Sequence, residues 1–182
     1  MSLKLPGHAS PAVGFEAPLE MLAACHARIE QQCATLRRLV PHVAGHGADA
    51  QARDAAASVM RYFDTAAVHH HADEEVDLFP ALIEAMAGSD AVCLRELTAG
   101  LAAEHRKLES RWWQVRGALA RAAVGAATSL DADDIDAFVG LYQRHIAREE
   151  NELLPMAARL LGDDALDRVG RAMRERRGIA PV

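Results

Sequence analysis

Apolar residues recur at steps of three and four along four long stretches of the chain. The stretches run over residues 18–40, 51–86, 91–124 and 133–161, with approximate ends. This period is that of an α-helix that buries one face, and no alternating strand pattern competes with it. Short polar or glycine-containing segments join the stretches, so consecutive helices are expected to run in opposite directions. We therefore predict an all-α fold, an antiparallel up-down four-helix bundle.

Prolines and capping residues set the expected helix ends. Pro41 and the glycines after it are expected to end the first helix. Ser89 or Asp90 is the expected N-cap of the third helix. Pro80 and Pro155 fall late in the second and fourth helices. We expect them to kink or end these helices, because proline lacks the donor that bonds to the preceding turn.

The boundaries divide the chain into three parts. Residues 1–17 contain prolines and glycines and are expected to form an irregular N-terminal leader. Residues 18–162 form the predicted bundle. Residues 163–182 are expected to contain a short C-terminal helix and a tail, with Asp163 as the helix cap.

Composition narrows the class of protein. The chain has 182 residues, of which 51% are hydrophobic, enough for one domain with a substantial core. Its net charge is -6 and no basic stripe is visible, which argues against a nucleic-acid partner. No apolar run reaches the roughly 18 residues of a membrane span. The three cysteines, Cys25, Cys33 and Cys93, and the lack of a convincing signal peptide predict reduced thiols in the cytoplasm.

Each predicted long helix carries one histidine on its apolar face and a glutamate four residues later. Residues four apart on a helix are neighbours, so each pair can present an imidazole and a carboxylate to one point. Facing inward, the four pairs would meet in the middle of the bundle. The four pairs are His26 with Glu30, His70 with Glu74, His105 with Glu109, and His145 with Glu149.

An internal repeat supports this arrangement. The segments "HHADEEVDLFP" and "HIAREENELLP" align without a gap as H-x-x-x-E-E-x-x-L-[FL]-P, and their first histidines, His70 and His145, are 75 residues apart. His26 and His105 are 79 residues apart in similar contexts. The chain therefore consists of two related helix pairs, in which the second and fourth helices carry the richer motif.

A metal centre explains the four histidines best. One histidine on an apolar face is usually a core residue, but four would leave many polar atoms to satisfy, at about 1–3 kcal/mol for each atom missed. Imidazole and carboxylate suit iron, manganese or zinc. Four histidines and two carboxylates exceed one tetrahedral zinc site, so two ions fit better. We predict these ligands: His26, His70, Glu74, His105, His145 and Glu149, with Glu109 and Glu30 as candidates for an additional ligand.

The two carboxylates are expected to bridge the ions. Each ion would then have two histidines and four protein donor atoms, and an oxo or hydroxo bridge would add a fifth. A position would stay open for a small ligand. His71 with Glu75 repeats the pattern of His70 with Glu74 shifted by one residue and is the alternative pair. The neighbouring residues His69, Asp73 and Asp77 are expected to face solvent or to support the ligands from behind.

The ordered set of residues resembles the hemerythrin family, in the broad sense of the HHE cation-binding domain. The resemblance covers residues 18–162 approximately and includes the "EEVDLFP" and "EENELLP" tails. It implies a four-helix bundle that holds a non-haem di-iron centre, and so favours iron over manganese or zinc. The residues that carry it are His26, His70 with Glu74, His105, and His145 with Glu149.

The chain departs from oxygen-carrying hemerythrins at two positions. Those proteins have a second histidine on the third helix, where this chain has Glu109, and they place the last carboxylate at the position of Glu150 rather than Glu149. A site richer in carboxylates holds ferric iron more firmly and disfavours reversible oxygen binding. The four-histidine, two-glutamate set looks more like the iron-centre repair proteins, although residues 1–17 are too short for their additional cysteine-containing domain.

We therefore expect a cytoplasmic di-iron protein that binds or senses oxygen, nitric oxide or peroxide, or handles iron. The alternative is a di-iron enzyme, a peroxidase, a nitric-oxide reductase or an iron-centre repair protein, and the residues leave enzymatic activity open. An iron store and a metal-free interaction domain are further alternatives. A ferritin-like site is disfavoured because no histidine follows a glutamate by three residues.

Overall fold

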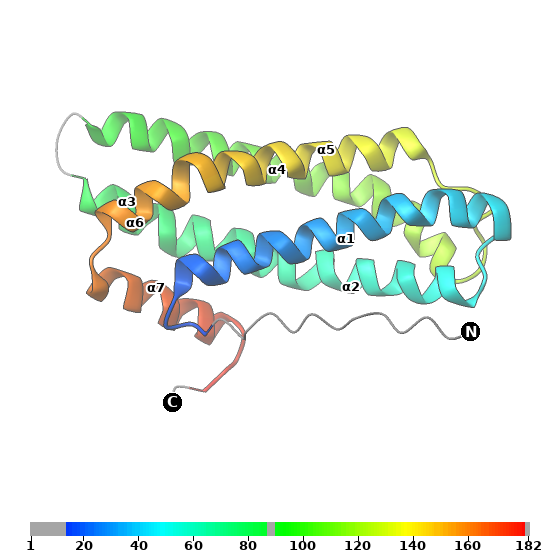
Figure 1. The fold of residues 1–182 in the computed structure, drawn as a ribbon, viewed down its shortest axis with the longest axis horizontal. Helices are drawn as coiled ribbons and strands as arrows, with labels where there is room; N and C mark the ends of the chain where they lie inside the picture. Colours follow the sequence, from blue (N-terminus) through cyan, green and yellow to red (C-terminus); the bar gives the residue numbers. More distant parts are fainter. Residues whose placement is uncertain (1–13, 87–89, 181–182) are drawn as a thin grey trace.

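Four long helices form the body of the protein in the computed structural model, which describes residues 14–86 and 90–180 (Figure 1). No strand is found in these two ranges, and the all-α prediction is confirmed. Most of the predicted leader, residues 1–13, lies outside the described residues, as does Ser89. The four long helices are α1 (Pro18–His46), α2 (Ala50–Ala72), α4 (Asp90–Ala123) and α5 (Ala132–Arg148).

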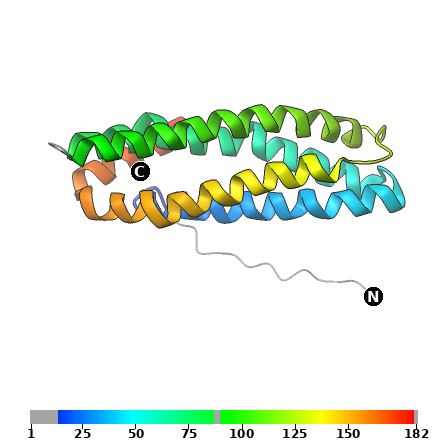
Figure 2. The same ribbon diagram turned by 90° about the horizontal axis from the view of Figure 1, so that it is seen from above.

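The four helices pack in a closed ring in which each contacts two others. Helix α1 packs against α2 and α5, and α4 packs against the same two helices. They lie side by side along the long axis of the molecule (Figure 2). Side chains of Asp49 and Asp131 cap α2 and α5 by accepting hydrogen bonds from backbone amides three residues later. These caps fix the starts of two helices, as expected of an up-down bundle.

A band of buried polar residues separates two apolar parts of the core. One part, around Leu36, Phe63 and Phe138, fills the bundle end that holds the α1–α2 loop. The other part, around Leu22 and Leu153, fills the opposite end. Along α1, α2 with η1, and α4, the buried histidines and Glu74 lie between the two parts in sequence, and Glu149 lies between Ile146 of the first part and Leu153 of the second. The fold therefore surrounds these polar side chains with apolar side chains on both sides.

Two helices change type just before a proline. Helix α2 continues through a π-helical segment, η1 (Asp73–Leu78), into α3 (Phe79–Ala85), and α5 continues through η2 (Glu149–Leu153) into α6 (Leu154–Leu160). The sequence predicts that the helices kink or end at Pro80 and Pro155. Instead, each helix changes type about one turn before its proline. A π turn bonds residues five apart, and each proline then falls in the first turn of the next helix, where a missing donor is tolerated.

The prediction that Pro41 ends the first helix is wrong. Helix α1 continues through Pro41 to His46 and ends at Gly47, which has a positive φ of 69°. Leu39 and Val43, on either side of the proline, are buried in the core. Their burial offsets the roughly 3 kcal/mol cost of a proline inside a helix.

A short C-terminal helix, α7 (Asp163–Arg176), packs against η1 and α1 (Figure 1). Its N-cap is Gly162, and the predicted cap Asp163 is its first residue. Arg176 and Arg177 donate hydrogen bonds to Asp73, which is completely buried. Asp73 therefore anchors α7 and does not face solvent. Within the described ranges, no helix combines the length and the apolar character needed to cross a bilayer.

Candidate metal centre

The structure brings the six predicted ligands together in the buried polar band. Each of the four long helices contributes one histidine, and each π-helical segment contributes one glutamate. None of the six residues exposes more than 2% of its surface. They are His26 from α1, His70 from α2, Glu74 from η1, His105 from α4, His145 from α5 and Glu149 from η2.

The six residues fall into two donor groups that share both carboxylates. Within each group, one nitrogen or oxygen atom of every residue lies within 4.8 Å of the others. The first group has the two histidines of α1 and α2, and the second has those of α4 and α5. Such sharing provides for two neighbouring ions with two bridging carboxylates. The first group is His26, His70, Glu74 and Glu149, and the second is His105, His145, Glu74 and Glu149.

Each glutamate directs its two oxygens toward different groups. In Glu149, Oε2 lies 3.1 Å from Nε2 of His26 and Oε1 lies 3.0 Å from Nε2 of His145. In Glu74, Oε1 lies 3.4 Å from Nε2 of His70 and Oε2 lies 3.3 Å from Nε2 of His105. Two donors at about 2.1 Å from one ion and at right angles would be about 3 Å apart. The spacing therefore fits a metal ion between each histidine and the carboxylates.

Buried polar atoms without a hydrogen-bond partner are concentrated here. All eight such side-chain atoms found in residues 14–86 and 90–180 belong to this cluster and to His71 beside it. Buried polar groups in native proteins are nearly always paired, so an unpaired set at one point indicates a site that can hold a cation. The atoms are Nε2 of His26, Nδ1 and Nε2 of His70, Nε2 of His71, and both carboxylate oxygens of Glu74 and of Glu149.

The electrostatics of the cluster favour a cation. Burial, together with the charge of Glu149, raises the pKa of Glu74 to about 7. Burial opposes the charged form of His105, but the nearby carboxylates of Glu149 and Glu74 outweigh it and raise its pKa to about 10. Without metal, protons must thus balance the buried carboxylates. Metal ions would displace these protons when they bind.

Three further carboxylates hold the outer nitrogens of the histidines. His105 donates from Nδ1 to Glu75 at 2.6 Å, and His26 donates from Nδ1 to Glu150 at 3.2 Å. His145 donates from Nδ1 to Glu104 at 2.9 Å. A carboxylate in this place orients a metal-binding imidazole and raises its basicity. The sequence reasoning assigned none of these roles, although the second glutamate of each "EE" pair was a visible signal.

Among the residues that the structure describes, His70 lacks such a partner on Nδ1. The repeat shows why. Glu104, the partner of His145, directly precedes His105, and the equivalent residue before His26 is Cys25. A thiol offers no carboxylate for His70. The two halves of the centre are therefore similar in their inner donors and different in the carboxylates that bind the outer nitrogens of the histidines.

His71, which the sequence pattern predicts only as the alternative to His70, is a buried residue of the centre. Its ring stacks on that of His105 with centroids 4.0 Å apart, and it exposes 6% of its surface. One of its nitrogens lies within 4.8 Å of donors of His105 and His145. Burial and the nearby His105 lower its pKa well below the usual range, so the ring is uncharged. Glu75, its partner in the alternative pair, contacts His105 and Arg106.

The two candidates for an additional ligand lie further out. Glu109 has a side chain that is 44% exposed and forms an ion pair with Arg106 at 3.2 Å. Glu30 is exposed on α1. Neither belongs to the donor groups found in the described part of the chain.

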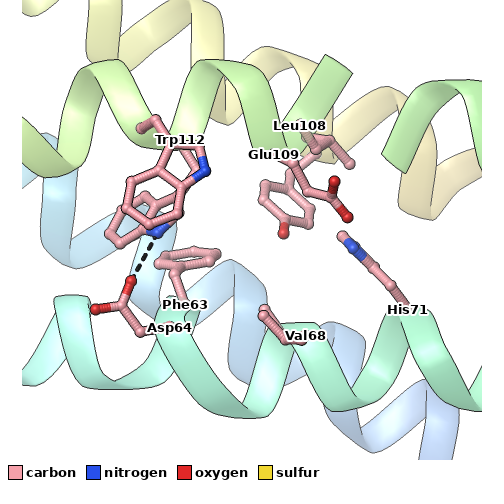
Figure 3. Close-up of a pocket in the computed structure, with 10 residues that line it drawn as sticks. Phe63, Asp64, Val68, His71, Leu108, Glu109 and Trp112 are labelled. Carbon is pink, nitrogen blue, oxygen red and sulfur yellow. Dashed lines mark hydrogen bonds between the residues drawn. The ribbon is translucent and has the colours of Figure 1, made fainter. Parts of the chain in front are cut away.

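An apolar pocket of about 330 Å³ lies between α2 and α4 beside the centre (Figure 3). His71 is at its inner side, and Trp112 on its wall donates a hydrogen bond to Asp64 at 2.9 Å. The remaining lining residues are Phe63, Ala67, Val68, Leu108, Glu109, Trp113 and Tyr142.

Comparison with known proteins agrees with this geometry. A family model described as "Hemerythrin HHE cation binding domain" matches residues 17–157, a range that contains all six predicted ligands. A protein of Haemophilus influenzae, described as uncharacterized, is 32% identical over 162 residues, which cover 89% of this chain and 91% of that protein. The chain belongs to the hemerythrin HHE cation-binding domain family.

Proposed function

We propose that the chain holds two iron ions in this centre and uses them to bind a small ligand such as oxygen, nitric oxide or peroxide. The observation that carries the proposal is the set of eight unpaired buried atoms, most of which belong to two donor groups with common carboxylates. Two histidines with carboxylates and open positions are typical of non-haem iron sites. The family supports a cation, and the donor set supports iron.

The residues of the chain have distinct roles in this proposal. Glu74 and Glu149 would each bridge the two ions, because their oxygens face different histidines. The outer carboxylates fix the imidazole rings, and the apolar core on both sides excludes water. Bound iron would supply a redox-active Lewis acid with positions open to a small ligand. The free cysteines keep the cytoplasm as the expected compartment.

Metal analysis of the purified protein tests the centre. We expect about two iron ions per chain and near-ultraviolet absorption bands that change on reduction and on exposure to air. His70→Ala and His145→Ala each remove one ligand from a different group and should lower the iron content. His69→Ala is the matched control, since His69 is in the same histidine run and outside both donor groups. One zinc ion per chain, or iron that survives both ligand substitutions, would contradict the di-iron proposal.

Ligand binding by the reduced protein tests the second half of the proposal. Oxygen, nitric oxide and peroxide would be added separately to the reduced protein, and the absorption bands followed. A stable complex with one of them supports binding or sensing. Continuous consumption of the ligand with an added reductant would instead support the enzyme alternative. No spectral response to any of the three would leave metal storage as the better reading.

A further inference from the structure

The internal repeat places two equivalent grooves on the bundle. The pocket between α2 and α4 has a counterpart of about 280 Å³ between α1 and α5. Both grooves are lined by residues that occupy equivalent positions in the two halves of the repeat. In the first pocket these are Val68, His71, Glu109 and Trp112, and in the second they are Gln143, Ile146, Glu30 and Cys33, respectively.

The two grooves differ at their inner ends. His71 lies against the metal centre, because its ring stacks on His105. The equivalent residue in the other groove is Ile146, which is 4% exposed and belongs to an apolar part of the core. The α2–α4 pocket thus has a polar side chain, His71, beside the donors, and the α1–α5 groove has the apolar side chain of Ile146 in the equivalent place. Only the half of the centre with His105 and His145 has a histidine in this place.

The lining of the α2–α4 pocket favours an uncharged ligand. Its walls are mainly apolar and aromatic (Figure 3). Two of its lining residues, Val68 and Trp113, are 53% and 66% exposed and lie at the surface. The ionisable side chains on the wall include two carboxylates, Asp64 and Glu109, which disfavour an anion. A small uncharged diatomic molecule can enter this environment because its transfer from water costs little free energy.

We propose that this pocket admits a small uncharged diatomic ligand to the His105–His145 half of the centre, where Nε2 of His71 donates a hydrogen bond to it. The inference rests on the proposed function and adds which ion binds the ligand and which residue contacts it. The Nε2 atom is buried and has no hydrogen-bond partner among the described residues, so the Nε2–H tautomer of the uncharged ring has a free donor there. The His105–His145 half is also the one that His71 reaches.

The geometry favours contact with the ligand over direct metal binding by His71. One ring nitrogen of His71 forms a group with His105 and His145 alone. The four-residue donor group at this half of the centre includes both carboxylates and omits His71. His71 therefore lies outside the donor group that contains the carboxylates, on the side of the centre that lines the pocket. A molecule that entered the pocket would lie between this nitrogen and the ion.

Nitric oxide binding to the reduced, iron-loaded protein tests the inference. His71→Ile introduces the residue that occupies the equivalent position, Ile146, in the other half of the chain. We expect unchanged iron content, nitric oxide release that is about two- to tenfold faster, as for one lost hydrogen bond, and loss of the solvent-deuterium shift of the N–O stretch. Val68→Trp at the pocket mouth should slow association severalfold, and Gln143→Trp at the equivalent mouth should leave it unchanged.

The outcomes separate the two proposals. Loss of iron or of the resting absorption bands in His71→Ile would overturn the inference, because His71 would then be a metal ligand. Unchanged release and an unchanged deuterium shift would overturn it too, as would equal effects of Val68→Trp and Gln143→Trp. In each case nitric oxide binding by the unmodified protein would still support the proposed function. If the unmodified iron-loaded protein bound no nitric oxide, oxygen or peroxide, the proposed function itself would fail.

Discussion

Nδ1 of His105 donates a hydrogen bond of 2.6 Å to Glu75, the residue that follows the inner carboxylate Glu74. The relationship recurs in the second half of the repeat, where His26 donates to Glu150 next to Glu149. The two glutamates of each "EE" pair therefore have different roles. The first glutamate faces the centre, and the second orients a histidine of the neighbouring helix.

Glu75→Gln should weaken metal binding about 10- to 100-fold, because an outer carboxylate fixes the ring and raises its basicity. Competition with a chromophoric chelator measures this change. Glu109→Gln is the matched control, since Glu109 shares the partner Arg106 and forms no ion pair with His105 among the described residues. Equal effects of the two substitutions would mean that Glu75 acts through Arg106 and not through the histidine.

Glu150→Gln should have a smaller effect than Glu75→Gln in the same experiment. The Glu150 side chain is 48% exposed and its bond to His26 is longer, at 3.2 Å, so water can replace it. The Glu75 side chain is 28% exposed. The reverse order of the two effects would contradict this interpretation of burial.

Asp73→Asn should detach α7 from the bundle. Asp73 is completely buried and pairs with Arg176 and Arg177, and loss of one partner of a buried pair costs about 3–5 kcal/mol. Urea unfolding of the metal-loaded protein and amide hydrogen exchange in α7 measure the effect. Asp77→Asn is the control, because Asp77 is partly exposed and pairs with Arg176 at 2.6 Å. It should cost about 1 kcal/mol or less, as partly exposed pairs do.

The free cysteines should differ sharply in reactivity. Burial raises the pKa of Cys25 and raises that of Cys33 to about 12, whereas Cys93 is exposed. At pH 8 only about one Cys33 side chain in ten thousand is then a thiolate, the reactive form. A disulfide reagent at pH 8 should titrate one thiol quickly and all three after unfolding in urea. Cys93→Ser should remove the fast phase, and a second fast thiol would contradict the burial of α1.

The closeness of the inner histidines and glutamates could be predicted because a helix of period 3.6 places His70 beside Glu74 and His145 beside Glu149. The roles of Glu75 and Glu150 could not, since a regular helical pattern does not indicate the π turns that begin near them. Asp73 was misread for another reason. Its partners Arg176 and Arg177 are more than 100 residues away in sequence, and local patterns carry no information about them.

The buried centre should cost stability when it is empty. Nδ1 and Nε2 of His70 are both buried without partners, and each unpaired buried group costs about 1–3 kcal/mol. His70→Leu should therefore raise the free energy of unfolding of the metal-free protein. In the metal-loaded protein the same substitution removes a ligand, and it should lower the free energy of unfolding because less binding energy stabilises the folded state.

Urea unfolding of the unmodified protein and of His70→Leu, each with and without metal, tests this change of sign in the free energy of unfolding. Circular dichroism first establishes that each metal-free protein is helical. His69→Leu is the matched control, because His69 is half-buried in the same run and outside the donor groups, and its effect should not depend on metal. If His70→Leu destabilised the metal-free protein as much as the loaded one, His70 would be an ordinary core residue. A change of sign confined to His70 would show that this position is selected for binding at a cost to folding.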